Sequence, residues 1–505
     1  MNKIKLLLIP LAIFLFSFFL RLSLISKGPY DVDCLDLALR AEETLSTHRL
    51  SYLHGAGYPL TVILGAIFVS VAKFFHTYNA VIAVNFMSVT FGSLCVLVQY
   101  QLTKKLLDET AAIFSSLMLS ISPIFLGVSL YGTSQVPFLF FLLLGVSFLL
   151  TYLKTGLKRH LIASAISLGL MTATREQDMT LIFWAISYLI FVGVETKKSA
   201  VIPLSKKKRL ILFLIFWFIT LLVTLPFHIP LLMDKEIRAP YLHEFYLEIK
   251  EGSWGNFMGI LSPKLPKAFG YLIESLTIGG FIFSLLGFIV LGKKKYKISV
   301  FLILWIIVPL FFYGNLYTNV SARYFLMILP PFIIAQACIL SQLVKSKHLL
   351  KFLTLVSFLI IFFILYSRFY SIFKFRHDHA LLPEFAQWVA KNTEPHAKII
   401  TADERIFIEY YGHRSTVGRP TWLFITPPQE IEKFKGNIDE IIASNIPVYI
   451  TASSLYAYDY HFHFSDFVKK NYRLDLVGKH GYEEWHAGVI TPQIFYCSLY
   501  KITKK

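Results

Sequence analysis

Long uninterrupted apolar runs are the feature that most limits what this chain can fold into. They lie near 4–26, 79–101, 109–130, 134–154, 160–176, 177–195, 208–232, 268–291, 297–314, 321–344 and 350–371. A helix needs about 20 mainly apolar residues to cross the hydrocarbon core of a bilayer. Hydrophobic residues make up 55% of the 505 residues, which is outside the range of soluble globular proteins. The sequence therefore predicts a mainly α, polytopic membrane helix bundle with about eleven spans.

Basic residues predict the orientation of this bundle. The formal charge is +18, and Lys and Arg gather in short loops at 104–105, 154–159, 197–209, 293–297 and 345–351. Such loops are typical of the cytoplasmic side, so nucleic acid is not needed as a partner to explain the charge. The first run lacks a small-residue cleavage site, and we expect it to be a retained helix. We therefore predict an inner (cell) membrane protein with a cytoplasmic N-terminus.

This orientation places the loops 27–57 and 233–267 outside, together with everything after 371. Counting 58–76 as a further complete span would put the lysines of 197–209 outside as well. We therefore expect 58–76 to be a juxtamembrane or re-entrant segment that is buried against protein.

The composition changes after the last apolar run, which predicts a membrane domain at 1–375 and an extracytoplasmic domain at 376–505. Buried strands are indicated at 397–403, 446–453 and 494–502, and amphipathic helices at 383–392 and 429–444. Alternation of helices and strands favours a soluble α/β domain with a largely parallel sheet. About 130 residues are enough to form a core of their own.

An acid-rich stretch follows the first span and is unusual in so basic a chain. It contains Asp31, Asp33, Asp36, Glu42, Glu43 and His54. A solvated amphipathic helix would explain the acids, with Leu35, Leu37 and Leu39 at the interface. Paired aspartates could instead bind a cation. One aspartate could also serve as a general base toward an acceptor hydroxyl. The spacing alone does not choose among these three interpretations.

Several cations are expected on the same outer face. Arg323 begins a span, where it could either snorkel to the interface or bind a phosphate through its planar guanidinium. Arg175 lies at a similar depth and could pair with Glu176 or Asp178 instead of a ligand. Lys264 and Lys267 are loop lysines that could also contact phosphate. A cavity lined by aspartates on one side and cations on the other would suit a lipid-linked phosphosugar.

Metal and disulfide signals are weak. Cys34, Cys95, Cys338 and Cys497 form no CxxC or His-Cys pattern, so no zinc site or disulfide framework is predicted. His461 and His463 would share one face of a strand, but two ligands do not make a site. Asp403 and Glu404 suggest a helix N-cap. We predict no cofactor, although a divalent cation is not excluded by the acids.

Several motifs together resemble the GT-C glycosyltransferases, and most closely the group that contains the protein O-mannosyltransferases and the lipid A aminoarabinose transferases. The resemblance rests on a first span, an outer loop with an Asp motif, and the sequence GYPL at 57–60. It continues through 120–144, 168–182 and 321–332, and ends with a soluble C-terminal domain. It implies a membrane enzyme that transfers a hexose or pentose from a polyprenyl-phosphate carrier, with inversion at the sugar carbon.

The resemblance also implies roles for individual residues. Asp33, with Leu37 and Ala41, matches the D-x3-Y-x3-A rhythm around the family's catalytic aspartate, and Asp31 and Asp36 lie close enough to support it. HGAGYP is similar to the family's turn near the donor, which implies substrate contacts for His54 and Tyr58. Arg323 and Tyr324 match the late Arg-Tyr pair, implied to contact the donor phosphate. Arg175 and Lys264 complete the expected substrate-binding set together with Gln135.

The sequence departs from the family pattern at three positions. Cys34 follows Asp33 where many relatives have Glu, and Leu37 replaces an aromatic residue. Gln135 stands where the family often has an acid, and its amide can bond a sugar hydroxyl but cannot act as a base.

The predicted function is transfer of a lipid-linked sugar to a lipid, glycan or protein acceptor at the extracytoplasmic face. The alternatives are a flippase or transporter of lipid-linked sugars and a non-catalytic membrane scaffold. A transporter of the common type would show repeated halves with midplane polar groups, and the sequence shows no internal repeat.

Overall fold

The computed structural model describes residues 3–53, 57–75, 79–193, 205–233, 265–316, 321–345, 348–402, 404–419, 428–456, 463–480, 484–485, 493–494 and 497–505. The chain divides into two compact units. The first, here called the helical unit, comprises Met1–Ile25 and Leu37–Phe373. The second, here called the mixed unit, comprises Ser26–Asp36 and Lys374–Lys505.

Helices occupy every predicted apolar run. They are α1 (Lys3–Leu22), α4 (Ala80–Leu106), α5 (Glu109–Ile121) with α6 (Pro123–Val128), α7 (Gln135–Thr155), α8 (Lys158–Thr174), α9 (Met179–Val192), α10 (Lys206–Met233), α12 (Leu265–Lys294), α13 (Tyr296–Phe311), η4 (Ala322–Ile328) with α14 (Leu329–Val344), and α15 (His348–Asp378). Within the described residues, six helices are long and apolar enough to cross a membrane. The prediction of a polytopic helical membrane protein is confirmed, whereas the number of spans stays a prediction.

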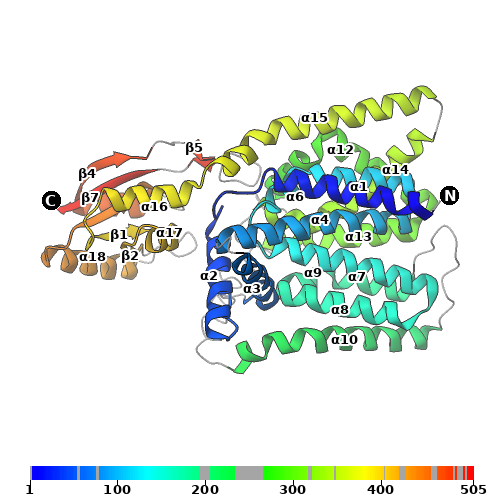
Figure 1. Ribbon diagram of the computed structural model, residues 1–505, viewed down its shortest axis with the longest axis horizontal. Coiled ribbons are helices and arrows are strands. Elements are labelled where there is room, and N and C mark those ends of the chain that lie inside the picture. The colour runs from blue at the N-terminus through cyan, green and yellow to red at the C-terminus, as the bar shows by residue number, and fades with distance from the viewer. Residues whose placement is uncertain are drawn as a thin grey trace. The chain divides into compact units, whose positions relative to one another are not determined.

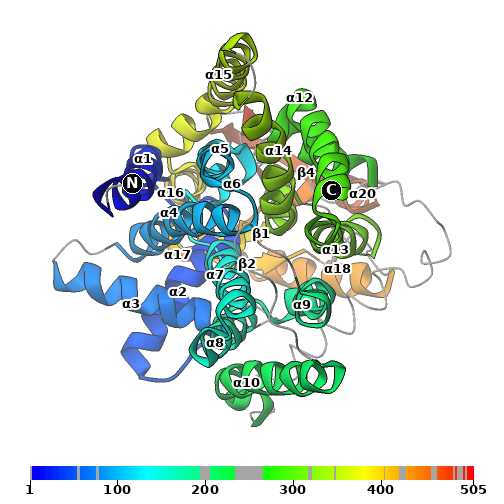
Figure 2. The same cartoon turned by 90° about the vertical axis from the view of Figure 1, so that its right-hand side faces the viewer.

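The long helices of the helical unit run side by side (Figures 1 and 2), with α7 packed against both α4 and α8. Helix α3 (Pro59–Phe74) lies across their direction in both views and has 16 residues. Its hydroxyl contact with α8, from Thr61 Oγ1 to the Thr174 carbonyl at 3.2 Å, fixes its start at one end of the bundle.

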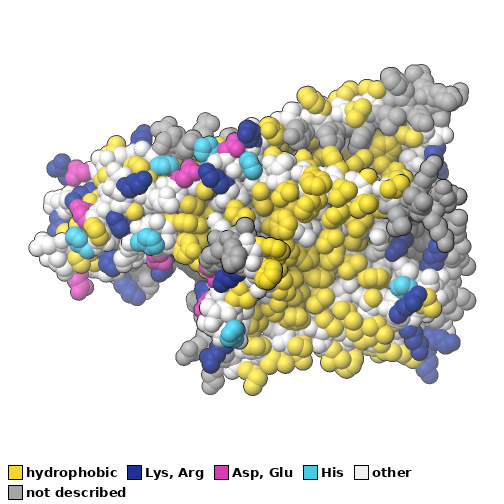
Figure 3. Space-filling view, viewed as in Figure 1, with side chains coloured by type: hydrophobic (Ala, Val, Ile, Leu, Met, Phe, Trp, Pro, Cys, Tyr) yellow, Lys and Arg dark blue, Asp and Glu magenta, His cyan; other side chains and the backbone are white. Residues whose placement is uncertain are grey.

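Apolar side chains cover the outer face of the helical unit (Figure 3). On α10, Leu214, Phe218 and Leu221 are each more than half exposed. Such a surface is unfavourable in water and favourable in hydrocarbon, so its place is the lipid of a multi-pass membrane protein.

Basic loops meet at one end of the helical unit. Lys295 Nζ, between α12 and α13, donates to the Leu106 carbonyl at 2.7 Å. Lys345, after α14, pairs with Asp108 between α4 and α5 at 2.7 Å. Lys105 Nζ reaches the Ser147 carbonyl in the second half of α7 at 2.9 Å. The sequence analysis assigned these loops to one side of the membrane only by counting spans, and the contacts now place them together at one end of the helical unit.

The mixed unit contains a five-stranded sheet with the order β2-β1-β3-β7-β4. Its strands are β1 (Lys398–Thr401), β2 (Ser415–Gly418), β3 (Val448–Thr451), β4 (Tyr472–Lys479) and β7 (Ser498–Lys504), and its longer helices are α16 (Leu381–Lys391), α18 (Pro428–Ala443) and α20 (His463–Asn471). Ile400, Ile438, Ile450 and Phe464 form the centre of its core.

The predicted α/β character of this unit is confirmed, but the expectation of a largely parallel sheet is wrong. Strand β1 pairs in parallel with β2 and β3, whereas β7 is antiparallel to both β3 and β4. Hydrophobic patterning identifies a strand but carries no information on its direction.

Candidate functional site

Tyr58 stands at the start of α3 in a strained backbone conformation. Its φ and ψ are 42° and 51°, in the left-handed region, after Gly57 with a φ of 85°. The left-handed region costs a residue other than glycine roughly 1–2 kcal/mol. Pro59 accounts for part of this geometry because a proline disfavours the right-handed helical conformation for the residue before it. The surrounding contacts hold Tyr58 in place, and its side chain is 9% exposed.

Arg175 lies over the Tyr58 ring, with its guanidinium carbon 5.1 Å from the ring centroid. Its Nε is 2.6 Å from Asp178 Oδ2, and its Nη1 donates to Ser134 Oγ at 3.1 Å. Arg175 and Asp178 are each 2% exposed. The ion pair therefore neutralises a cation that would be costly to bury alone. Between the two acids that the sequence offered as partners, Asp178 forms this pair.

The cluster extends through two tyrosines. The hydroxyl of Tyr313, in η3 (Phe312–Leu316), donates to Asp178 Oδ1. Tyr313 stacks on Tyr324 with ring centroids 5.1 Å apart, and the Arg323 guanidinium lies 5.6 Å from the Tyr324 ring. Arg323 and Tyr324 are both partly exposed. One buried and one partly exposed arginine thus belong to the same aromatic cluster.

Gln135 is the first residue of α7 and follows directly on the loop that supplies Ser134 to this cluster. The backbone N–H groups of Gly132 and Thr133 donate to Asn85 Oδ1 and Ser88 Oγ at 2.8 and 3.2 Å. Thr133 Oγ1 donates to Gln135 Oε1, and Gln135 is 5% exposed. Buried polar groups of α4 therefore fix the loop before α7, and with it the position of Ser134.

We call this group the Arg175 cluster: Tyr58, Ser134, Arg175, Asp178, Tyr313, Arg323 and Tyr324. Its members come from five places: the starts of α3 and α7, the end of α8, the segment η3 after α13, and the start of η4. Lys154, Lys158, Lys295 and Lys345 stand at the opposite ends of α7, α8, α13 and α14. The cluster therefore lies at the end of the helical unit away from the basic loops.

The three aspartates differ in their surroundings. Asp31 caps helix α2 (Val32–Thr47), because its Oδ1 accepts the Cys34 backbone N–H at 3.0 Å. Asp33 lies in the first turn of α2 and is partly exposed, whereas Asp36 is 9% exposed. Asp31 therefore has a structural task, and Asp33 is the more accessible carboxylate beside it.

The later acids of α2 are partnered within the helical unit. Burial raises the pKa of Glu42, and Lys73 partly offsets this. Hydrogen bonds from Ser51 and Arg40 lower the pKa of Glu43. Leu35, Leu37, Ala38 and Ala41 are buried on the same helix. Helix α2 is thus amphipathic, but it also carries a nearly buried Asp36.

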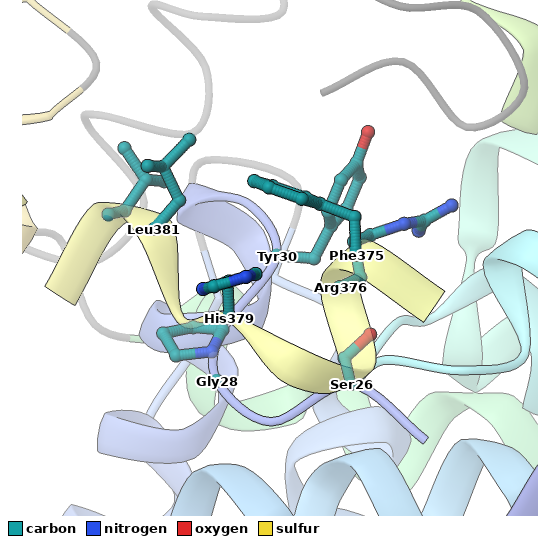
Figure 4. A pocket seen from close by; sticks show the side chains of 9 residues that line it. Ser26, Gly28, Tyr30, Phe375, Arg376, His379 and Leu381 are labelled. Carbon is teal, nitrogen blue, oxygen red and sulfur yellow. The ribbon is translucent and has the colours of Figure 1, made fainter. Parts of the chain in front are cut away.

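The segment that precedes α2 borders a cavity within the mixed unit (Figure 4). The cavity is small, with a volume of about 20 Å³, and is lined by Ser26, Gly28, Pro29, Tyr30, Phe375, Arg376, His379, Leu381 and Leu382.

Several predicted residues lie outside the described part of the chain: His54, Lys264, His461 and Asp403. Among the described residues, no three His, Cys, Asp or Glu side chains converge in a way that could hold a metal ion. All four cysteines are buried, and none of them forms a disulfide.

Sequence reasoning missed Ser134, Tyr313 and Arg376. A signal existed for Tyr313, since it ends an apolar run opposite the basic loop at 293–297. Nothing in the local sequence distinguishes Ser134 or Arg376, because their positions depend on contacts with distant segments.

Comparison with known proteins supports the fold. Residues 62–227 match the family model described as dolichyl-phosphate-mannose-protein mannosyltransferase. ArnT from Cupriavidus metallidurans, solved bound to undecaprenyl phosphate, is similar with a TM-score of 0.60 and 11% identity over 99% of this chain and 98% of that one. Archaeal oligosaccharyltransferase AglB from Archaeoglobus fulgidus, solved with an inhibitory peptide and a dolichol-phosphate, is also similar. Its TM-score is 0.57 and its sequence identity is 13%, over 92% of this chain and 72% of that one.

No curated protein sequence matches the chain. At such low identity the structural matches establish the fold and not the substrate. The fold match to ArnT nonetheless runs over nearly the whole length of both chains. The protein therefore has the fold of the GT-C superfamily of membrane glycosyltransferases, and the resemblance seen in its sequence is confirmed.

Proposed function

We propose that this protein is an integral-membrane glycosyltransferase that moves a sugar from a polyprenyl-phosphate carrier to an acceptor at the extracytoplasmic face. The observation that carries the proposal is the Arg175 cluster, in which residues from five segments of the chain meet at one end of a GT-C fold. The matched ArnT and AglB structures hold undecaprenyl phosphate and a dolichol-phosphate, which are both polyprenyl phosphates.

The orientation follows from the basic loops. Because positive loops favour the cytoplasmic side, the end with Lys105, Lys295 and Lys345 would face the cytoplasm together with the N-terminus. The Arg175 cluster would then be extracytoplasmic. The parity of the apolar runs would put everything after residue 371 on that side as well, and the membrane would be the cell (inner) membrane.

Arg323 is the better phosphate ligand of the two arginines in the cluster. The charge of Arg175 is already compensated by Asp178, whereas Arg323 is partly exposed beside Tyr324. A guanidinium can bind phosphate oxygens in a bidentate manner. Lys264 would support Arg323, while His54, Tyr58, Gln135 and Tyr324 would contact the donor sugar and phosphate.

Asp33 would be the general base. The acceptor oxygen attacks the anomeric carbon, the bond from that carbon to the phosphate oxygen breaks, and its electron pair leaves with the phosphate. The acceptor proton goes to Asp33, and Arg323 stabilises the charge that develops on the leaving phosphate. Attack from the face opposite the phosphate inverts the sugar carbon. Asp36 would support Asp33, and Asp31 would hold the start of the helix.

The test combines a gene deletion with two matched substitutions. Mass spectrometry of surface glycans should show a missing sugar in the deletion strain, restored by the wild type and by Asp31→Asn, since asparagine also caps helices. Asp33→Asn should not restore it, while undecaprenyl phosphate should still raise the melting temperature of the purified variant. Restoration by Asp33→Asn would exclude the proposed base and would favour a transport role.

A further inference from the structure

The segment that carries the aspartates folds with the C-terminal part of the chain. Residues Ser26–Asp36 belong to the mixed unit, although more than 300 positions separate them from its remainder. The Lys27 backbone N–H donates to the Arg376 carbonyl at 3.0 Å, and Lys27 Nζ donates to the Asp378 carbonyl at 3.1 Å. Two hydrogen bonds thus join the segment before Asp31 to the end of α15.

A cation–π contact reinforces this junction. The Arg376 guanidinium lies 4.2 Å from the centroid of the Tyr30 ring, and the two side chains are 4% and 7% exposed. Figure 4 shows Tyr30 and Arg376 side by side along the cavity. Such contacts are strongest where water is excluded, as it is here. Tyr30 immediately precedes Asp31, so a shift of its ring would move the cap of α2.

The backbone of Gly28 packs directly against Ala380 at the same junction, so the two segments cannot shift relative to each other. A Cβ placed on Gly28 would lie 2.7 Å from the Ala380 Cβ and 3.3 Å from the Ala380 Cα. The segment therefore approaches the start of α16 as closely as a glycine backbone permits.

Helix α16 in turn is fixed to the sheet. Phe385 and Ala386 on α16 are completely buried. Arg414, just before β2, donates to the Thr393 carbonyl at 2.9 Å, and the Trp388 ring packs on Gly478 of β4. A continuous path of packed groups therefore runs from the sheet to Tyr30.

We propose that the mixed unit positions the catalytic carboxylate, and that Arg376 and Tyr30 are its positioning residues. This inference rests on the proposed function, since Asp33 must be the base for its position to matter. The first turn of α2 would keep Asp33 within reach of the acceptor only while Arg376 holds Tyr30. The C-terminal domain would then be required for the chemical step and not only for acceptor recruitment.

The experiment uses the full-length protein with Tyr30→Leu, Tyr30→Phe and Arg376→Gln. Phe keeps the aromatic face and Leu removes it. Arg473→Gln on β4 serves as the control, because Arg473 pairs with Asp475 on the surface with a 71% exposed side chain. Transfer rates are measured over a range of donor concentrations at saturating acceptor, which gives kcat and the KM for the donor, and hydrogen exchange is followed at residues 26–36.

Tyr30→Leu and Arg376→Gln should lower kcat on the order of 10²-fold, as expected for a misplaced catalytic group, and should accelerate exchange at 26–36. KM for the donor should stay within about twofold, and Tyr30→Phe and Arg473→Gln should behave as the wild type. Unchanged exchange in Tyr30→Leu, or a wild-type kcat despite faster exchange, would overturn the inference. If Tyr30→Phe also lost activity, the Tyr30 hydroxyl and not the cation–π contact would be what positions the carboxylate. Transfer by Asp33→Asn would instead sink the proposed base, and hydrogen exchange would still report on the junction.

Discussion

Removing the charge of Asp178 should destabilise the helical unit strongly, because it leaves Arg175 buried without a counter-ion. Both side chains are 2% exposed, and the pair is 2.6 Å long. Asp178→Asn keeps the size of the side chain and an oxygen that can accept from Tyr313. Breaking a buried pair by removing one partner costs about 3–5 kcal/mol. That is a large part of the roughly 5–15 kcal/mol that usually separates folded from unfolded protein.

Glu43→Gln is the matched control. Arg40 and Glu43 are also an Arg and an acid three residues apart, at 2.8 Å, but their side chains are 41% and 48% exposed. The loss of an exposed helical pair costs about 0.5 kcal/mol or less. The two variants differ chiefly in burial, because each removes the charge of an acid that pairs with an arginine three residues earlier.

A thiol-reactive fluorogenic dye can follow the unfolding of both variants. All four cysteines are buried thiols outside any disulfide, so they react with the dye only when unfolding exposes them. Asp178→Asn should unfold at a clearly lower temperature than Glu43→Gln. In a cycle with Arg175→Met, the double variant Arg175→Met/Asp178→Asn should recover part of the loss. Equal melting of Asp178→Asn and the wild type, or a coupling near zero, would refute the reasoning. So would an Arg175→Met variant that loses donor affinity without losing stability, since the arginine would then be a ligand and not a structural cation.

Three further outcomes are expected. On α12, Gly287→Ala should lower the melting temperature, because the new Cβ would overlap the Ala335 carbonyl of α14. Gly270→Ala on the same helix should be neutral or slightly stabilising, because its Cβ would meet no atom within 4 Å. Arg323→Lys should weaken the thermal shift by undecaprenyl phosphate less than Arg323→Gln, and equal shifts in all three proteins would remove Arg323 from the donor site. Burial lowers the pKa of His480 in the folded mixed unit, and Glu384 partly offsets this. The contribution of His480 to stability should therefore be complete above the unfolded pKa near 6.5 and should fall as the pH drops below it. Hydrogen exchange at β7 should show this pH dependence in the wild type and not in His480→Asn.

Hydrophobicity alone located the helices, because an apolar run of spanning length has few alternatives in lipid. Their parity in turn placed Arg175 and Arg323 on one face, and contacts within the helical unit now bring both into one cluster with Tyr58. The resemblance to GT-C enzymes supplied the roles, which stay predictions until the substitutions are made.

Partners chosen over long distances could not be predicted in the same way. The sequence offered Glu176 and Asp178 equally to Arg175, and the choice depends on Tyr313, 135 positions later along the chain. The antiparallel entry of β7 likewise has no local signature, because alternation of side chains is the same in either direction. The cap formed by Asp31 was within reach of sequence rules, since Asp before an apolar helical pattern is a standard helix start.

The two arginines of the cluster show how burial divides tasks between like residues. Arg175 is enclosed, paired and placed against the strained Tyr58, so its charge serves to hold α3, α7 and α8 in register at the end of the bundle. Arg323 touches the same aromatic group at its partly exposed edge, where an anion can approach without the full cost of stripping its water. If Arg323 binds the donor phosphate as proposed, the buried ion pair beside it would order this phosphate site before the donor arrives.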